Sequence, residues 1–165
     1  PQGDPRGRRR GDHPTQTMIT IESKAKFPAK LLETAARAAL EHQSAPLDSD
    51  LTIVLTDDQW IQELNRDYLG IDAPTDVLSF PASQIDPETG SPYLGDILIS
   101  LPYAAKSAER AGHPLEAEVQ LLVVHGVLHL LGHDHAKVRE KARMWKAQAE
   151  ILELLGLGHI KVREE

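Results

Sequence analysis

Cysteine is absent from all 165 residues of the chain. Disulfide-linked partners and thiolate metal sites are therefore excluded, and any bound metal must be held by nitrogen or oxygen. Long apolar segments are missing too. The longest mostly apolar run, residues 121–131, is interrupted by two histidines and is shorter than the ~20 residues that span a bilayer. Because no apolar signal-peptide core occurs near the first residue, we expect a cytoplasmic protein without membrane contact.

Positive charge is in deficit, with 18 lysines and arginines against 25 acidic residues and a net charge of −7. This balance argues against general nucleic-acid binding over the whole surface. It is compatible with a local basic patch, because electrostatic fields act over roughly 10 Å in physiological salt. The hydrophobic fraction of 41% is ordinary for a globular protein. The length suits one domain with its own core.

The pattern of the chain predicts one α+β domain over residues 18–165, after a disordered extension over residues 1–17 that is rich in arginine and proline. Strands are predicted over 18–24, 51–55, 76–80 and 94–101, with a Ser-, Pro- and Gly-containing loop over 82–93. Helices are predicted from Pro28, over 57–68 with Trp60, Ile61 and Leu64 facing the core, and over 102–111, 114–131 and 137–155. The expected architecture is a small mixed four-stranded sheet with about five helices, one of them a zincin-like metal helix.

A cluster of histidines lies in the segment HGVLHLLGHDH, residues 125–135. His125 and His129 are four residues apart, so on a helix they share one face. A third ligand on the same helix, at His133, would lie about 12 Å from His125 along the axis, too far for bonds of about 2 Å. The chain must therefore reverse, and Gly132 supplies the turn. We expect His125, His129 and His135 to bind one Zn²⁺ ion.

The spacing of these histidines also occurs in metzincin peptidases, which place a glutamate directly after the first histidine as the general base. Here that position is Gly126. Glycine cannot accept a proton, so the peptidase mechanism lacks its base. The ligand set persists without the peptidase chemistry. Three ligands and an acidic neighbour favour an open coordination position for catalysis, and a purely structural zinc is the alternative.

Several blocks together resemble the YbeY family of bacterial single-strand endoribonucleases. They are LNRDYL at residues 64–69, PTDVLSFP at 74–81, LGDILIS at 94–100, the histidine segment, and Met144 with Glu150 near the end of the chain. The resemblance covers about residues 18–157. It implies maturation of the 16S rRNA 3′ end, ribosome quality control and contact with the small ribosomal subunit. It also implies zinc on His125, His129 and His135, beside a cleft between the sheet and the metal helix.

One position departs from the family. After the tyrosine of LNRDYL the family typically has a catalytically important arginine, whereas this chain has Leu69. Phosphodiester cleavage builds up negative charge that a cation stabilises. Arg66, one turn earlier, is the first candidate to replace that cation, although a solvated surface role is the alternative.

The remaining candidates surround the predicted metal. Asp134 or His133 is expected to orient water or to move protons, while a capping or ligand-orienting role is the alternative for Asp134. Thr75, Asp76 and Ser79 are expected to line the cleft; a structural turn is the alternative for Asp76.

Lys137 and Lys141 begin a helix with five basic residues and share one of its faces, which suggests an RNA-binding patch or simply a solvated surface. Two other functions stay open for the whole protein. One is a metal-dependent hydrolase of another substrate. The other is a ribosome-binding factor that keeps zinc only for folding.

Overall fold

The computed structural model describes residues 17–23, 25–85 and 92–160. They form four strands and five helices, which confirms the predicted α+β class. In chain order these are β1 (Met18–Ser23), α1 (Ala29–His42), β2 (Asp50–Thr56), α2 (Asp58–Leu69), β3 (Val77–Ile85), β4 (Pro92–Ser100), α3 (Leu101–Ala111), α4 (Leu115–Leu130) and α5 (Val138–Leu154). Apart from Thr17, the predicted extension lies outside the described residues.

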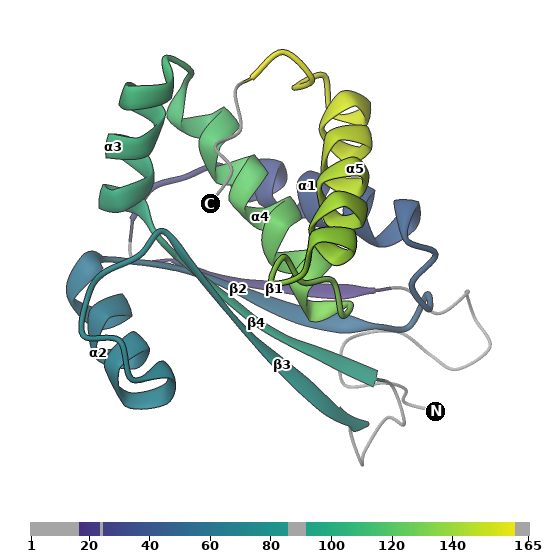
Figure 1. Cartoon of the computed structure of the whole chain (residues 1–165), viewed down its shortest axis with the longest axis horizontal. Coiled ribbons are helices and arrows are strands. Elements are labelled where there is room, and N and C mark those ends of the chain that lie inside the picture. Colours follow the sequence, from purple (N-terminus) through teal and green to yellow (C-terminus); the bar gives the residue numbers. More distant parts are fainter. Residues whose placement is uncertain (1–16, 24, 86–91, 161–165) are drawn as a thin grey trace, which may run out of the picture.

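The sheet is mixed, as the sequence predicted, and has the strand order β1-β2-β4-β3. β1, β2 and β4 run parallel, while β3 runs antiparallel to β4 as an edge strand. Helices α1, α4 and α5 lie on one side of this sheet and α2 lies on the other (Figure 1). Within the described ranges, none of the helices is both long and apolar enough to cross a membrane.

The alternation of side chains along β4 separates two packing regions. Ile97 and Ile99 are fully buried on the face covered by α4 and belong to the main core. Leu98 points to the opposite face, where it packs with Leu78 and with Ile61 of α2. Because successive residues of a strand face opposite sides, this one strand holds α4 and α2 on the two faces of the sheet.

Helix α4 is the central element of the fold, and twelve of its sixteen residues are buried. An ordinary surface helix has one apolar stripe, whereas a helix that is apolar around its circumference belongs in a core. The sheet lies against one side of α4, and α1, α3 and α5 pack against the others. Ligands carried on this helix are therefore held on an element that the sheet and three other helices surround.

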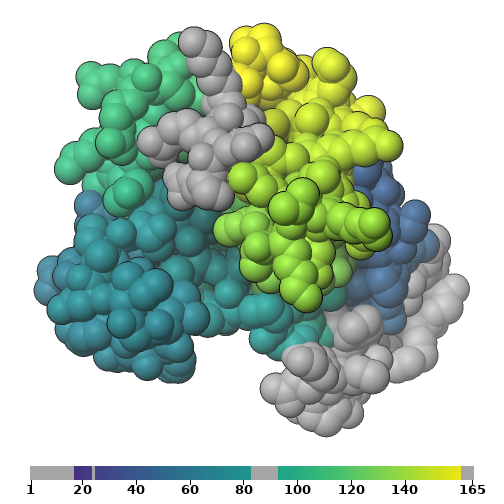
Figure 2. All heavy atoms as spheres, in the orientation of Figure 1, coloured from purple at the N-terminus to yellow at the C-terminus, as the bar shows by residue number. Residues whose placement is uncertain are grey.

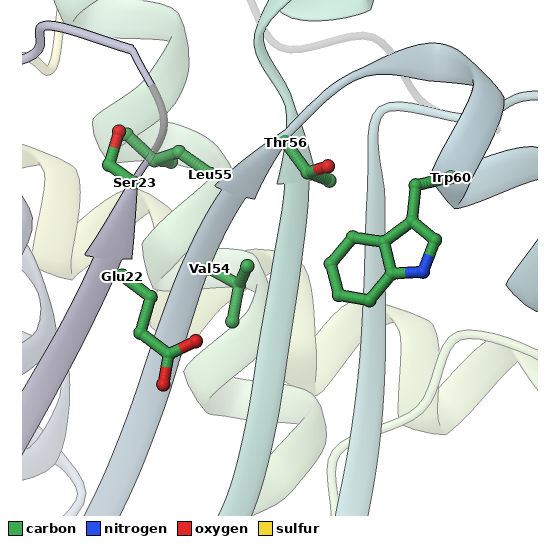
Figure 3. A pocket seen from close by; sticks show the side chains of 6 residues that line it. All are labelled: Glu22, Ser23, Val54, Leu55, Thr56 and Trp60. Atoms are coloured by element: carbon green, nitrogen blue, oxygen red, sulfur yellow. The ribbon is translucent and has the colours of Figure 1, made fainter.

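Two expectations about local structure were wrong. The segment 82–93 is not entirely a loop, since β3 continues to Ile85 and β4 begins at Pro92, with residues 86–91 outside the description. Trp60 does not face the core and is 42% exposed. Its ring lines a pocket of about 370 Å³ with Glu22 and Thr56 at the carboxyl ends of β1 and β2, as Figure 3 shows.

Candidate metal centre

The end of α4 arranges the histidine cluster. The helix stops at Leu130, and Gly132 follows with φ of 99°, a backbone conformation that suits glycine. The backbone N–H of His133 then donates to the carbonyl of Leu128 at 2.9 Å, which closes the turn. The chain reverses there, as the sequence predicted, and His135 returns to His125 and His129.

The three histidines bring one ligand nitrogen each to within 4.8 Å of one another. The Nε2 atoms of His125 and His129 are 3.1 Å apart. Two nitrogens bound tetrahedrally to one zinc ion at about 2.0–2.1 Å lie about 3.4 Å apart. The cluster thus fits a single metal ion, which His125, His129 and His135 could hold.

The tautomers of two histidines also fit this arrangement. His125 Nδ1 lies 3.0 Å from Oε1 of Gln148, and His129 Nδ1 lies 3.0 Å from the backbone carbonyl of His133. Both partners accept hydrogen bonds, so each Nδ1 carries the proton and each Nε2 keeps a free lone pair. Such outer partners fix the ring orientation of metal-binding histidines.

Gln148 was not identified from the sequence. It is 2% exposed, lies on α5 and comes 23 residues after the histidine that it orients. Its only local signal is a polar residue on the buried side of a helix, a pattern that many structural glutamines share.

Replacing Gln148 by leucine is expected to weaken Zn²⁺ binding roughly 10- to 100-fold, because His125 loses the acceptor that orients its ring. Competition with a chromophoric chelator measures the dissociation constant. Gln120→Leu is the matched control, since Gln120 is also buried but donates to a helix carbonyl. Equal affinities in the two variants would refute the orienting role.

Burial favours the neutral form of two of the clustered imidazoles, those of His125 and His129. It lowers the pKa of His125 to about 4, with the neighbouring His129 as the next cause. Burial is also the main cause that lowers the pKa of His129, followed by the proximity of His135. Neutral imidazole is the form that binds a metal ion, so the site is prepared for a cation and resists protonation.

The metal-free protein is expected to lose stability as the pH falls from 6.5 toward 4. In this pH range His125 becomes protonated in the unfolded chain, where its pKa is 6.5, but stays neutral in the folded protein. Protonation therefore favours the unfolded state. The loss from this residue is on the order of 3 kcal/mol when complete. Urea unfolding in the presence of chelator at pH 7.5 and pH 5 measures it. A His125→Gln variant with an undiminished pH dependence would contradict this origin.

Trp145 and Lys141 of α5 form one wall of the cluster. The ring of Trp145 lies 5.8 Å from that of His125 and 5.7 Å from that of His135, between centroids. Lys141 places its Nζ 5.8 Å from the centre of the indole. Lys141 thus lies beside the indole that flanks the histidines, whereas Lys137 is the exposed N-cap residue of α5.

Of the two candidates for proton transfer, Asp134 is exposed and His133 is half-buried. Its Oδ1 accepts from the backbone N–H of His135 at 2.7 Å, which supports the turn as the capping alternative expected. The ring of His133 points to α1, where its Nε2 lies 2.6 Å from Oε1 of Gln43. His133 contacts the cluster through its backbone carbonyl instead.

The predicted cleft residues lie on β3 and on the segment just before it. Ser79 lies against the metal helix, with its hydroxyl donating to the carbonyl of Gly126 at 3.4 Å. Asp76 is three residues earlier, about 10 Å along an extended chain, and its carbonyl accepts from the N–H of Ser100 at 2.9 Å. The Thr75 hydroxyl donates to the carboxylate of Asp76 at 3.4 Å. Ser79 therefore contacts α4 directly.

Arg66 is exposed on α2, across the sheet from α4, and its Nε donates to Asp67 at 3.1 Å. That carboxylate is the main cause of a raised pKa of Arg66. The structure does not bring Arg66 together with the histidines. Figure 2 shows the start of α5 in lime on the same visible side as the blue-teal α2, with the strands set back between them.

Comparison with known proteins decides the family. The sequence model of the family described as endoribonuclease YbeY matches residues 15–156. The chain belongs to the YbeY family. Curated YbeY relatives include the endoribonuclease YbeY of Persephonella marina, 45% identical over 75% of this chain and 81% of the relative. The endoribonuclease YbeY of Nocardia farcinica is 39% identical over 82% of this chain and 77% of the relative.

The fold has a counterpart among solved structures as well. The solution structure of TM1509 from Thermotoga maritima matches with a TM-score of 0.55 and 27% sequence identity, over 84% of this chain and 92% of that one. The resemblance to the YbeY family drawn from LNRDYL, PTDVLSFP and the histidine segment is thereby confirmed.

Proposed function

We propose that this YbeY protein is a zinc-dependent single-strand endoribonuclease that matures the 3′ end of 16S rRNA and takes part in ribosome quality control. The observation that carries the proposal is the convergence of three imidazoles with their ligand nitrogens within 4.8 Å. The relatives named endoribonuclease YbeY support RNA as the substrate. The small ribosomal subunit is the partner, and the cytoplasm the location, that this role requires.

Residues around the metal have separate roles in this proposal: binding the ion, orienting its ligands and accepting a proton. A Zn²⁺ ion held by the three histidines would act as a Lewis acid on the phosphodiester. Gln148 and the carbonyl of His133 orient two of the ligands. The solvent-facing carboxylate of Asp134, whose Oδ1 accepts from the backbone N–H of His135, would take the proton that the attacking nucleophile gives up.

Positive charge on α5 binds the substrate in this proposal. Lys141 lies beside Trp145 at the edge of the cluster, and Lys137 precedes it on the exposed side. Charge there offsets the repulsion between RNA and a chain with a net charge of −7. Ser79 borders the same site from the sheet. The roles of Thr75, Asp76 and Arg66 remain predictions.

Incubation with single-stranded and duplex RNA tests the function. We expect the zinc-loaded protein to cut single strands and to stop cutting in the presence of a strong chelator. Activity is expected to return when Zn²⁺ is restored, because all three protein ligands belong to one chain. Cleavage that persists after complete metal removal rejects the mechanism. Binding to ribosomal subunits without any cleavage identifies a ribosome-binding factor instead.

A further inference from the structure

A chain of hydrogen bonds leads from the surface of α5 to the metal-binding turn. Glu150 Oε1 is 2.8 Å from Nε2 of His42, and Nδ1 of His42 is 2.9 Å from Nε2 of Gln43. Oε1 of Gln43 is then 2.6 Å from Nε2 of His133. The backbone carbonyl of His133 accepts from the ligand His129. Neither α1 nor α5 carries a zinc ligand, yet side chains of both are linked to the turn through these hydrogen bonds.

With His42 neutral, one assignment of protons satisfies every bond. The carboxylate of Glu150 only accepts, so Nε2 of His42 carries the hydrogen and Nδ1 has the lone pair. That lone pair takes the N–H of the Gln43 side chain, which turns the amide oxygen toward His133. His133 then donates from Nε2. The carboxylate on α5 thereby fixes the orientation of an amide on α1.

This series of hydrogen bonds matters for the metal centre because it ends at His133, in the metal-binding turn. The turn after α4 carries the ligand His135 and the carbonyl that orients His129, and it includes a glycine with positive φ. In the described structure the ring of His133 ties this turn to the end of α1, where Gln43 caps the helix. Helices α1 and α5 are packed against each other, so each supports the other's part of the anchor (Figure 1).

We propose that Gln43, His42 and Glu150 are positioning residues for the metal centre. They hold the turn so that His129 and His135 meet His125 before the metal arrives. A preorganised ligand set binds more tightly because less ordering remains to be done on binding. The affinity for Zn²⁺ therefore depends on an exposed carboxylate two side chains away from the turn. This inference rests on the proposed metal site.

Zinc affinity, measured by chelator competition, and the visible absorption spectrum of the Co²⁺-substituted protein test the inference. Gln43→Leu is expected to raise the dissociation constant roughly 10- to 100-fold, as loss of outer-sphere partners does, and to shift the Co²⁺ bands. Glu150→Ala is expected to act in the same direction with a smaller effect. Glu150→Gln is expected to retain affinity, since its amide oxygen also accepts from His42.

The double variant distinguishes a chain from two independent contacts. If Glu150 acts through Gln43, adding Glu150→Ala to Gln43→Leu changes nothing further. Glu153→Ala, an exposed acid one turn along α5, is the matched control and is expected to bind zinc as the wild type does. Because Glu150 is 51% exposed, its replacement preserves the fold even if Gln43→Leu does not.

Three results overturn the inference. Affinity and Co²⁺ spectra unchanged in Gln43→Leu and in Glu150→Ala reject it while leaving the metal site intact. Fully additive effects of the two substitutions on zinc affinity show that Glu150 does not act through Gln43, and they reject the proposed series of hydrogen bonds. A wild-type protein that binds neither Zn²⁺ nor Co²⁺ rejects the proposed function itself, together with everything that rests on it.

Discussion

Replacing His129 by alanine is expected to abolish stoichiometric zinc binding and to lower RNA cleavage about a thousandfold. His129 has the central place in the cluster, with Nε2 3.1 Å from that of His125 and its ring centroid 5.1 Å from that of His135. Loss of a Lewis acid removes several kcal/mol of transition-state stabilisation, and about 4 kcal/mol is a factor of a thousand. Elemental analysis and single-turnover cleavage on the same preparation measure both effects.

The matched control is His159→Ala, which removes an exposed histidine outside the cluster. It is expected to keep its zinc and its cleavage rate. A His129→Ala protein that is folded, free of metal and still cuts RNA at the wild-type rate would separate the activity from the histidine cluster. Circular dichroism on both variants establishes that they are folded before activities are compared.

Placing glutamate at position 126 is expected to destabilise the fold strongly rather than to create a peptidase. Gly126 is buried, and a Cβ atom there would lie 2.8 Å from Cγ2 of Ile97 and 3.1 Å from its Cδ1. Overpacking of this kind costs about 1–3 kcal/mol, and an unpaired buried carboxylate adds several more. A total of roughly 5 kcal/mol lowers the melting temperature of a domain of this size by about 10–20 °C.

Thermal unfolding followed by circular dichroism measures this loss. Gly126→Ala, which adds the Cβ but no charge, is expected to lose only the packing part. Ala105→Glu on the exposed face of α3 introduces the same charge where solvent surrounds it, so it is expected to melt like the wild type. If Gly126→Glu and Ala105→Glu have the same melting temperature, the close approach of α4 to β4 does not require a glycine at position 126.

The parts of the site that depend on neighbours in sequence could be predicted, and those that depend on contacts between distant elements could not. The i, i+4 spacing of His125 and His129 and the turn at Gly132 are local features, so they indicated a converging third histidine. Gln148 and Gln43 reach the site from α5 and α1. Nothing in their own segments distinguishes them from other helical glutamines.

The errors in the fold have the same origin. Residues 82–85 have the composition of a loop, but pairing of β3 with β4 continues to Gln84 opposite Tyr93 and Ile85 opposite Pro92. Hydrogen bonds to a partner strand there outweigh weak local preferences. Trp60 was expected inside because α2 looked amphipathic, yet α2 covers only part of its sheet face and buries just Ile61 and Asn65.

The burial of α4 has a consequence for genetics. Almost every position of this helix is either buried or carries a ligand, so a random mutational scan is expected to find it intolerant from Ala117 onward. That result has two different causes. Most substitutions lower the amount of folded enzyme, whereas those at His125 and His129 remove the activity of an enzyme that is still folded. Measuring cellular abundance beside growth separates the two classes and reveals which alleles are suitable for trapping an uncut substrate.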